Sequence, residues 1–305
     1  MRVLVITNPQ ATSTSARERR VLANALGAHA ELTVEETANR GHAAALACRA
    51  MREHVDVVIA LGGDGTVNEV VNGVLTDGLH SHLPSIGIVP VGSTNVFARA
   101  LGLPEDPVEA TDGLMEALRT GRRRLVSLGR ADDRWFTFAA GVGFDAAVVG
   151  QVEKHRRRGR RSTHTLYVRT AVSEFFRSDR RHGPLTIDRP DGTSISGLHM
   201  AIVANTTPWT YFGSRPVTPT PEASFDEGLD LYARRSMRLG PILFGAAQIM
   251  RKGSHRDPGA LVEHDLAGLT IRSSRPVPVQ VDGDYIGEHT EIRFWSIPRA
   301  ISMVL

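Results

Sequence analysis

Short apolar runs alternate with helical patterns along the first third of the chain. Residues 3–7 and 56–61 are almost continuously apolar, as strands buried on both faces are, whereas 41–54 repeats apolar residues at helical spacing. The same reasoning predicts strands at 30–34 and 86–89 and helices at 15–26, 67–75, 96–101 and 108–119. This alternation of strands and helices predicts an α/β fold with a parallel sheet covered by helices on both faces.

The pattern changes after Gly121, where three consecutive arginines form a plausible hinge. Helical periodicity is scarce from there to residue 231, and the apolar runs at 135–140, 185–188, 199–204 and 229–233 are separated by turns rich in Gly, Pro and Asp. We therefore expect two domains, an α/β domain over residues 1–124 and a mostly antiparallel β domain over residues 125–305. The last residues are candidates for a return to the first domain.

Composition narrows the class of protein. With 305 residues, 41% hydrophobic and 23% charged, and a net charge of +3, the chain is typical of globular proteins. Cys48 is the only cysteine, which excludes an internal disulfide and a zinc site built from cysteines. The N-terminus lacks the pattern of a signal peptide, and no long apolar run could span a membrane, so we expect a cytoplasmic protein.

Three glycines surround Asp64 in the motif Gly62-Gly63-Asp64-Gly65-Thr66, between an expected strand and an expected helix. Glycines at this place let backbone N–H groups approach phosphate, the helix N-terminus adds partial positive charge, and an aspartate can orient a magnesium ion or its waters. An ordinary strand-to-helix turn needs only one glycine. Because the lysine of a Walker loop is absent, the motif predicts a phosphate site without lysine.

Two further loops follow expected strands in the same way, namely Gly92-Ser93-Thr94-Asn95 and Asn8-Pro9. The carboxyl ends of parallel strands meet at one edge of a sheet, where ligands of open α/β sheets bind. We therefore expect the three loops to converge on one binding site.

Taken in order, these motifs resemble the diacylglycerol kinase catalytic-domain family of bacterial soluble lipid kinases, which is related to the sphingosine kinases. The motifs that carry the resemblance are Asn8-Pro9, Thr37 with Gly41-His42-Ala43, GGDGT at 62–66 with Asn68-Glu69, the block at 92–99 followed by Leu101-Gly102, and Gly141-Val142-Gly143-Phe144-Asp145-Ala146. GGDGT alone is shared with NAD kinases and phosphofructokinase-like enzymes, but the ordered set extends over nearly the whole chain.

The resemblance implies an N-terminal ATP-binding kinase domain and a C-terminal β-sandwich that receives the lipid. It implies ATP and Mg²⁺ as cofactors and transfer of the γ-phosphoryl group to the hydroxyl of diacylglycerol or a similar lipid alcohol. The nucleotide-binding residues that it implies are Asn8, Pro9, Thr37, Gly62, Gly63, Asp64, Gly65, Thr66, Asn68, Glu69, Gly92, Ser93, Thr94 and Asn95.

The chain departs from the family pattern at three places. Val96 stands where many members have aspartate, and Asp282-Gly283-Asp284 stands where many have a triplet ending in the general-base glutamate. We expect Asp284 to be the general base, with Asp282 as its structural neighbour and Asp64 at the phosphates. Without the family, the triplet is equally well explained as a hairpin turn between two strands.

The third departure concerns a structural magnesium site that bacterial members carry at an Asp-Asp-Gly sequence. This chain has Asp226-Glu227-Gly228 there, and the implied ligands are Ser224, Asp226, Glu227 and Leu229. An exposed acidic loop explains the sequence equally well.

Residues 151–181 carry ten basic and three acidic side chains, a local charge of +7, and apolar residues at helical spacing. A solvated surface helix is the simpler interpretation. The functional interpretation is peripheral docking on the anionic inner face of the membrane, where a lipid substrate lies. No nucleic-acid recognition motif accompanies the charge, and the sequence leaves open whether the chain forms a homodimer.

Three functions remain in competition at this point. An ATP-dependent lipid kinase agrees best with the ordered motifs. An NAD kinase-like enzyme shares only GGDGT, and a nucleotide- or lipid-binding relative without catalysis is kept open by Val96 and Asp284. Residues 141–146 also match the dinucleotide pattern GxGxxA, but no acidic residue follows at the distance that a ribose contact requires.

Overall fold

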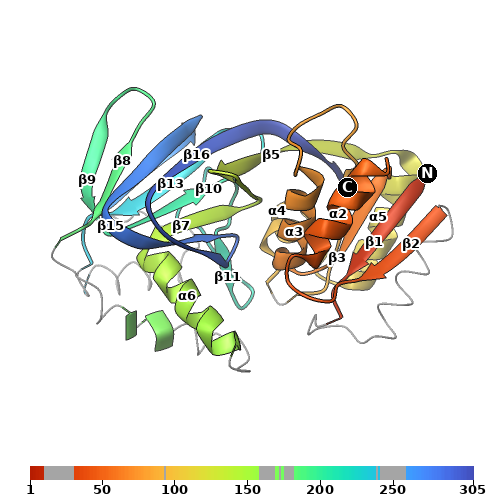
Figure 1. Cartoon of the computed structure of the whole chain (residues 1–305), viewed down its shortest axis with the longest axis horizontal. Helices are drawn as coiled ribbons and strands as arrows, with labels where there is room; N and C mark the ends of the chain where they lie inside the picture. The colour runs from red at the N-terminus through yellow and green to blue at the C-terminus, as the bar shows by residue number, and fades with distance from the viewer. Residues whose placement is uncertain are drawn as a thin grey trace. The chain divides into compact units, whose positions relative to one another are not determined.

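The structure is a computed structural model that describes residues 1–9, 31–92, 94–157, 169–171, 173–174, 182–237, 240 and 259–305. It divides into two compact units, which we call unit 1 (Met1–Ser127 with Arg299–Leu305) and unit 2 (Leu128–Pro298) (Figure 1). The strands β5 (Arg123–Ala131) and β16 (Asp284–Val304) each have residues in both units. The expected boundary after Arg124 therefore falls inside a strand, where the sequence pattern is continuous.

Unit 1 contains a parallel sheet in the order β4–β3–β1–β2. The strands are β1 (Arg2–Thr7), β2 (Glu31–Glu36), β3 (Val57–Gly62) and β4 (Ser85–Pro90). The chain places β2 on one side of β1 and then β3 on the other. The order of connection thus reverses between β1 and β3, which is where open α/β sheets bind ligands.

The helices of unit 1 are α2 (His42–Arg52), α3 (Asp64–Val74), α4 (Val96–Ala100) and α5 (Pro107–Thr120). Alternate residues of the central strands, such as Val5 and Ile59, form a core cluster with Leu114 of α5. The intervening residues, such as Ile6 and Val58, are also completely buried. Both faces of the sheet are therefore covered, and the α/β prediction for this part of the chain is confirmed.

Unit 2 is built on antiparallel strands. They are β6 (Arg134–Phe136), β7 (Ala139–Gly143), β8 (Leu185–Asp188), β9 (Ser194–Leu198), β10 (Met200–Ala204), β11 (Thr210–Phe212), β12 (Arg215–Val217), β13 (Leu229–Arg234), β14 (Ala260–Leu266) and β15 (Gly268–Val281). The order β14–β13–β10–β7–β15–β16 is antiparallel throughout. The antiparallel β fold predicted for the second half of the chain is therefore confirmed.

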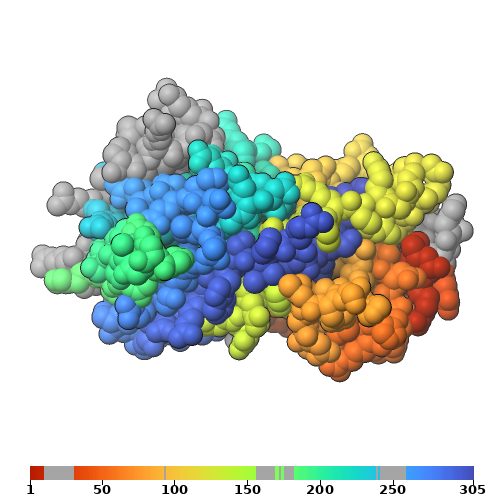
Figure 2. Space-filling model, turned by 90° about the horizontal axis from the view of Figure 1, so that it is seen from above, coloured from red at the N-terminus to blue at the C-terminus, as the bar shows by residue number. Residues whose placement is uncertain are grey.

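The long strand β15 pairs with different neighbours along its length. β15 pairs with β7 through residues 279–281 and with β8 through residues 270–273. Its register shifts between Arg272 and Val277, where the strand changes partners. The β8–β9 hairpin lies at the surface (green in Figure 2), and Ile187, Ile271 and Phe294 are buried in the common core.

Helix α6 (Phe144–Arg157) follows β7 directly, so it begins before the segment at 151–181 in which the sequence showed helical spacing. Gly143 has a φ of 83°, a left-handed conformation that turns the chain from strand into helix. The helix packs against the sheet of unit 2 beside β7 and β15 (Figure 1).

Some expectations fall on residues outside the described ranges. They are the helix at 15–26, the side chain of Ser93 and most of the basic segment at 151–181. Among the residues that are described, no helix has the length and apolar character needed to cross a membrane.

Candidate functional site

The carboxyl ends of β1, β3 and β4 lie side by side in unit 1. Thr7 is paired with Leu61, and Gly62 with Pro90. Just beyond the strands, the backbone N–H of Asn8 donates to the carbonyl of Leu61 at 3.4 Å, and that of Val91 donates to the carbonyl of Gly62 at 3.2 Å. The predicted convergence of the three loops at one edge of the sheet is therefore observed.

Two of these loops approach so closely that only glycine fits. A Cβ atom added to Gly92 would lie 2.9 Å from the Cα of Gly63 and would also collide with the side chain of Asn95. Asn95, which has a φ of 47°, closes its loop by accepting a hydrogen bond from the N–H of Gly92 at 3.0 Å and donating one to its carbonyl at 2.8 Å. The result is an edge of half-buried backbone with little side-chain bulk, suited to close approach of phosphate.

Asp64 holds the start of α4. Its two carboxylate oxygens accept hydrogen bonds from the N–H groups of Val96 at 2.9 Å and Phe97 at 3.1 Å. Helix α4 has no cap from its own N-cap side chain, so Asp64 binds donors that the helix itself leaves without partners. Asp64 therefore joins the GGDGT loop to the Gly92 loop.

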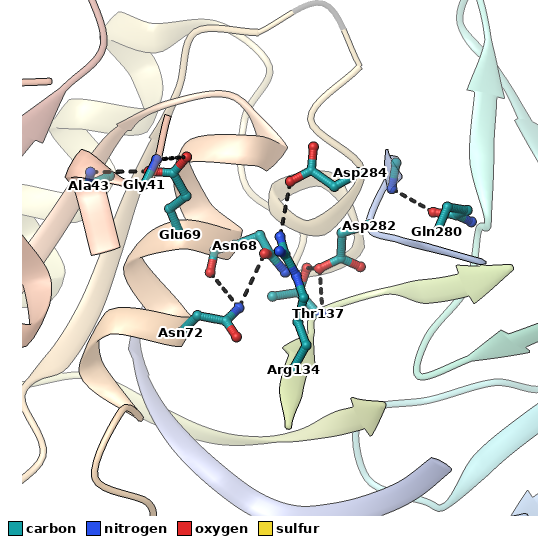
Figure 3. Close-up of polar contacts among 11 residues, drawn as sticks. Gly41, Ala43, Asn68, Glu69, Asn72, Arg134, Thr137, Gln280, Asp282 and Asp284 are labelled. Carbon is teal, nitrogen blue, oxygen red and sulfur yellow. Dashed lines mark hydrogen bonds and ion pairs between the residues drawn. The ribbon is translucent and has the colours of Figure 1, made fainter. Parts of the chain in front are cut away.

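Glu69 likewise holds the start of α2. Its carboxylate accepts hydrogen bonds from the N–H of Gly41 at 2.9 Å and of Ala43 at 3.1 Å (Figure 3). The N-cap residue Gly41 has no side chain with which to cap the helix. Glu69, expected at the nucleotide, thus binds the backbone of the loop after β2, which begins at Thr37. Its neighbour Asn68 is buried and accepts a hydrogen bond from Asn72.

The described residues of unit 1 offer few carboxylates that could bind Mg²⁺. The described residues contain no group of three or more His, Cys, Asp or Glu side chains that could hold a metal ion. Mg²⁺ is usually held by one or two carboxylates together with substrate phosphates and waters. Asp64 could supply such a carboxylate, because it lies in the GGDGT loop at this edge of the sheet.

In unit 2, Asp282 and Gly283 form a two-residue turn between β15 and β16. Val281 pairs with Asp284, and both turn residues have positive φ, 48° and 80°, as a type I′ hairpin requires. The predicted hairpin is therefore confirmed.

The carboxylate of Asp282 is buried and binds the backbone beside β7. It accepts hydrogen bonds from the N–H and hydroxyl of Thr137 at 2.7 and 2.8 Å, and from the N–H groups of Phe138 and Ala139 at 3.0 and 3.2 Å. Burial raises the pKa of Asp282, and these hydrogen bonds oppose the rise. Asp282 is thus an anchor for the turn.

Asp284 lies two residues after Asp282 and differs from it in exposure and in its partner. Its side chain is 23% exposed and forms an ion pair with Arg134 at 3.0 Å (Figure 3). Arg134 belongs to β6, so the ion pair links the turn to a second strand of unit 2. Of the two carboxylates of the turn, only Asp284 is accessible to a ligand.

Four residues of this part of unit 2 had no role in the sequence analysis: Arg134, Thr137, Asp145 and Gln280. The available signals were a polar residue within the apolar strand at 277–281 and an aspartate within the block at 141–146. Arg134 and Thr137 had no such signal, because nothing in the sequence pairs residues almost 150 positions apart.

The residues expected to bind a structural magnesium ion lie at the start of β13. The N–H of Asp226 donates to the Ser224 hydroxyl at 3.2 Å, and that of Glu227 donates to the Ser224 carbonyl at 3.4 Å. The carboxylate of Glu227 lies 3.5 Å from Nε2 of His264. A ligand set that includes the carbonyls of Ser224 and Leu229 stays a prediction.

The glycine-built edge and its capping carboxylates can be compared with known proteins. Residues 2–131 match the family model of the diacylglycerol kinase catalytic domain. Residues 2–131 are thus similar to the diacylglycerol kinase catalytic domain. The resemblance seen in the motifs is therefore confirmed, and the three loops lie within the matched residues.

Relatives support the same family. The chain is 39% identical over 146 residues to a diacylglycerol kinase of Staphylococcus aureus, a match over 47% of this chain and 44% of that one. It is 39% identical over 113 residues to a diacylglycerol kinase of Staphylococcus saprophyticus, over 37% and 35% of the two chains. The match thus spans less than half the length of these relatives.

Solved structures extend the likeness of fold beyond the catalytic domain. A diacylglycerol kinase structure from Bacillus anthracis is 20% identical, with a TM-score of 0.73 and coverage of 99% of this chain and 96% of the other. A second structure from that organism is 21% identical, with a TM-score of 0.76 and the same coverage. The fold of both units is therefore shared with these proteins.

Proposed function

We propose that the protein is an ATP-dependent lipid kinase that transfers the γ-phosphoryl group to the hydroxyl of diacylglycerol or a similar lipid alcohol. The observation that carries the proposal is the edge of unit 1 where the GGDGT and Gly92 loops meet, in residues that match the diacylglycerol kinase catalytic domain. The relatives support it, because the proteins that match this part of the chain are named diacylglycerol kinases.

Unit 1 is proposed to bind the nucleotide. Backbone N–H groups of the Gly62 and Gly92 loops would bind the phosphates, because the two loops exclude side chains from this edge. Mg²⁺ would arrive with ATP and neutralise charge on the phosphates, with Asp64 as a protein carboxylate for the ion or its waters. Glu69 and Asn95 would act indirectly, by holding the loops that contact the nucleotide.

Unit 2 is proposed to supply the general base. The Asp284 carboxylate would accept the proton of the lipid hydroxyl as its oxygen bonds to the γ-phosphorus. The bond between that phosphorus and the β,γ-bridging oxygen breaks, and ADP leaves. Arg134 would orient the carboxylate, because its guanidinium lies 3.0 Å from one carboxylate oxygen.

The proposal is tested with the purified chain, radiolabelled ATP and Mg²⁺, and diacylglycerol, sphingosine or NAD as acceptor. We expect labelled lipid with diacylglycerol and no labelled NAD. Label on NAD alone would support the NAD kinase-like alternative, and ATP binding without product would support a relative that has lost catalysis.

A further inference from the structure

A buried polar contact in unit 2 lies beneath the turn that carries Asp284. Asp145 is in the first turn of α6 and is 8% exposed, and Gln280 is in β15 and is 3% exposed. The amide nitrogen of Gln280 donates a hydrogen bond to Oδ2 of Asp145 at 2.9 Å. Neither side chain was assigned a role above, and both are buried where a polar group needs a partner.

The strand between them is shaped to allow this contact. Gln280 of β15 pairs with Gly141 of β7. A Cβ atom at Gly141 would collide with Oδ2 of Asp145 and would lie 2.7 Å from the amide nitrogen of Gln280. Glycine at this position therefore leaves the space that the Asp145–Gln280 hydrogen bond occupies.

The other end of the Gln280 amide holds the turn. Its carbonyl oxygen accepts a hydrogen bond from the N–H of Gly283 at 2.8 Å, as Figure 3 shows. A carboxylate accepts hydrogen bonds, so Asp145 selects the orientation in which the amide nitrogen faces α6. The amide oxygen is then the end that faces Gly283. The chain of contacts runs from Asp145 through Gln280 to the residue before Asp284.

We propose that Asp145 and Gln280 are positioning residues for Asp284, the carboxylate assigned above as general base; the inference rests on the proposed function. Asp282 fixes the first residue of the turn to the backbone at 137–139, and Gln280 fixes the second. With both anchors in place, the backbone of Asp284 has one position relative to β7. Removal of the Gln280 side-chain amide takes away the hydrogen bond that holds Gly283.

The test uses the full chain with Gln280→Leu, which keeps most of the side-chain volume, and Asp145→Asn, which keeps one acceptor oxygen. Misplacement of a catalytic group by about 1 Å can lower a rate about 100-fold. We expect Gln280→Leu to lower kcat by about 10- to 100-fold with the KM for ATP within about twofold of wild type. Asp145→Asn should lose less than Asp145→Ala.

A double variant separates positioning from general loss of structure. If Gln280 acts through Asp284, then Gln280→Leu should cause no further loss in an Asp284→Asn background, because effects of groups that act as a unit are not additive. An equal loss in both backgrounds, or an unchanged kcat in Gln280→Leu, would overturn the inference. Glu263→Ala is the matched control: it removes a mostly buried ion-pair partner of Arg189 in unit 2, and kcat should be unchanged.

A measurement without substrate tests the positioning role of Gln280 and Asp145 independently of the proposed kinase activity. Hydrogen exchange of the Gly283 amide should be faster in Gln280→Leu and in Asp145→Ala than in wild type and Glu263→Ala. Unchanged exchange in both variants would overturn the contact. Wild-type protein without kinase activity on any lipid alcohol would overturn the proposed function, whereas faster exchange would still support the Asp145–Gln280 anchor.

Discussion

Single carboxylates in this chain differ in the partners that they bind. Asp64, Glu69 and Asp282 each accept hydrogen bonds from two or more N–H groups of other segments. Asp284 instead forms an ion pair with Arg134 and keeps 23% of its side-chain surface exposed. A carboxylate that already accepts several N–H groups is poorly placed to accept a substrate proton, so its partners separate Asp284 from the other three.

The first prediction compares the two aspartates of the turn. Asp284→Asn should lower kcat by about 10² to 10⁴, with little change in the KM for ATP, because a general base is lost and its shape is kept. Asp282→Asn should instead lower the free energy of unfolding, because an amide nitrogen cannot accept from the N–H groups at 137–139. Steady-state kinetics and urea denaturation measure both. If Asp282→Asn lowers kcat more than Asp284→Asn does, the assignment of the two aspartates is reversed.

A second prediction concerns the protonation of Asp145. Burial raises its pKa to about 6, and the hydrogen bond from Gln280 opposes the rise. Between the ordinary aspartate pKa near 3.9 and this value, the folded state binds more protons than the unfolded state, so stability falls as pH rises through that window. Asp145→Asn removes this titration.

The variant should therefore gain stability relative to wild type by about 2 kcal/mol between about pH 4 and about pH 7. Denaturant unfolding of both proteins at the two pH values gives the difference in their free energies of unfolding. Any effect of the substitution that does not depend on pH cancels when the two values are compared. A difference that does not change with pH would mean that Asp145 titrates as it does in the unfolded chain.

Helices and loops of unit 1 depend on caps from outside their own sequence. Neither α2 nor α4 is capped by the side chain of its own N-cap residue, whereas α5 is capped by Asp106 through the N–H groups of Val108 and Glu109. The cap of α4 comes from Asp64 at the start of α3, and the cap of α2 comes from Glu69 in its middle. One helix therefore orders the loops on both of its sides, and these are loops proposed to contact the nucleotide.

The third prediction tests this dependence at α2. Glu69→Ala removes the acceptor of two N–H groups and should lower the free energy of unfolding by about 1 to 2 kcal/mol. It should also raise the KM for ATP, because the loop from Thr37 to Gly41 loses its anchor. Glu116→Ala on α5 is the control, since its pair with Arg119 is exposed and should contribute little to stability. An unchanged KM for ATP in Glu69→Ala would separate this loop from nucleotide binding.

Taken as a single chain, the protein completes its N-terminal unit with its last residues. Met303 pairs in parallel with Ile86 of β4, and Met303 and Val304 are completely buried in unit 1. The hydroxyls of Ser85 and Ser302 share a hydrogen bond at 3.0 Å. The stability of the proposed nucleotide unit therefore depends on residues more than 200 positions away.

The fourth prediction follows from that burial. Met303→Ala should lower the free energy of unfolding by about 2 to 5 kcal/mol, whereas Met303→Leu, which nearly keeps the volume, should cost less than about 1.5 kcal/mol. Denaturation followed by hydrogen exchange would place the loss in β3 and β4. Equal stability of the two variants would contradict the burial of this side chain in a packed core.

The fifth prediction concerns the basic segment at 151–181, of which the structure describes only part. Replacement of Arg156, Arg157, Arg158, Arg160 and Arg161 by glutamine should weaken binding to anionic vesicles and spare turnover on a short-chain, water-soluble acceptor. Binding of wild type should fall from about 0.1 M to about 1 M salt, because the Debye length shrinks from about 10 Å to about 3 Å. Vesicle sedimentation measures the binding. If the variant binds as well as wild type, the segment has no role in membrane docking.

Local pattern was sufficient for much of the molecule. The apolar runs predicted β1, β3 and β4, and helical spacing predicted α2, α3 and α5, because each depends on residues that are neighbours in the chain. The turn at Asp282-Gly283 was likewise predicted, since two residues that tolerate positive φ stood between two strand-like runs. The order of motifs was enough to indicate the kinase family.

Contacts between distant segments could not be read in this way. Nothing local shows that Glu69 caps α2, that Asp282 binds the backbone at 137–139, or that Asp145 holds Gln280. The start of helix α6 was missed because it depends on the left-handed Gly143 and on packing against β7 and β15. Burial, partner and register are properties of the folded chain, and they decide which of several similar carboxylates supports the fold and which one is accessible for chemistry.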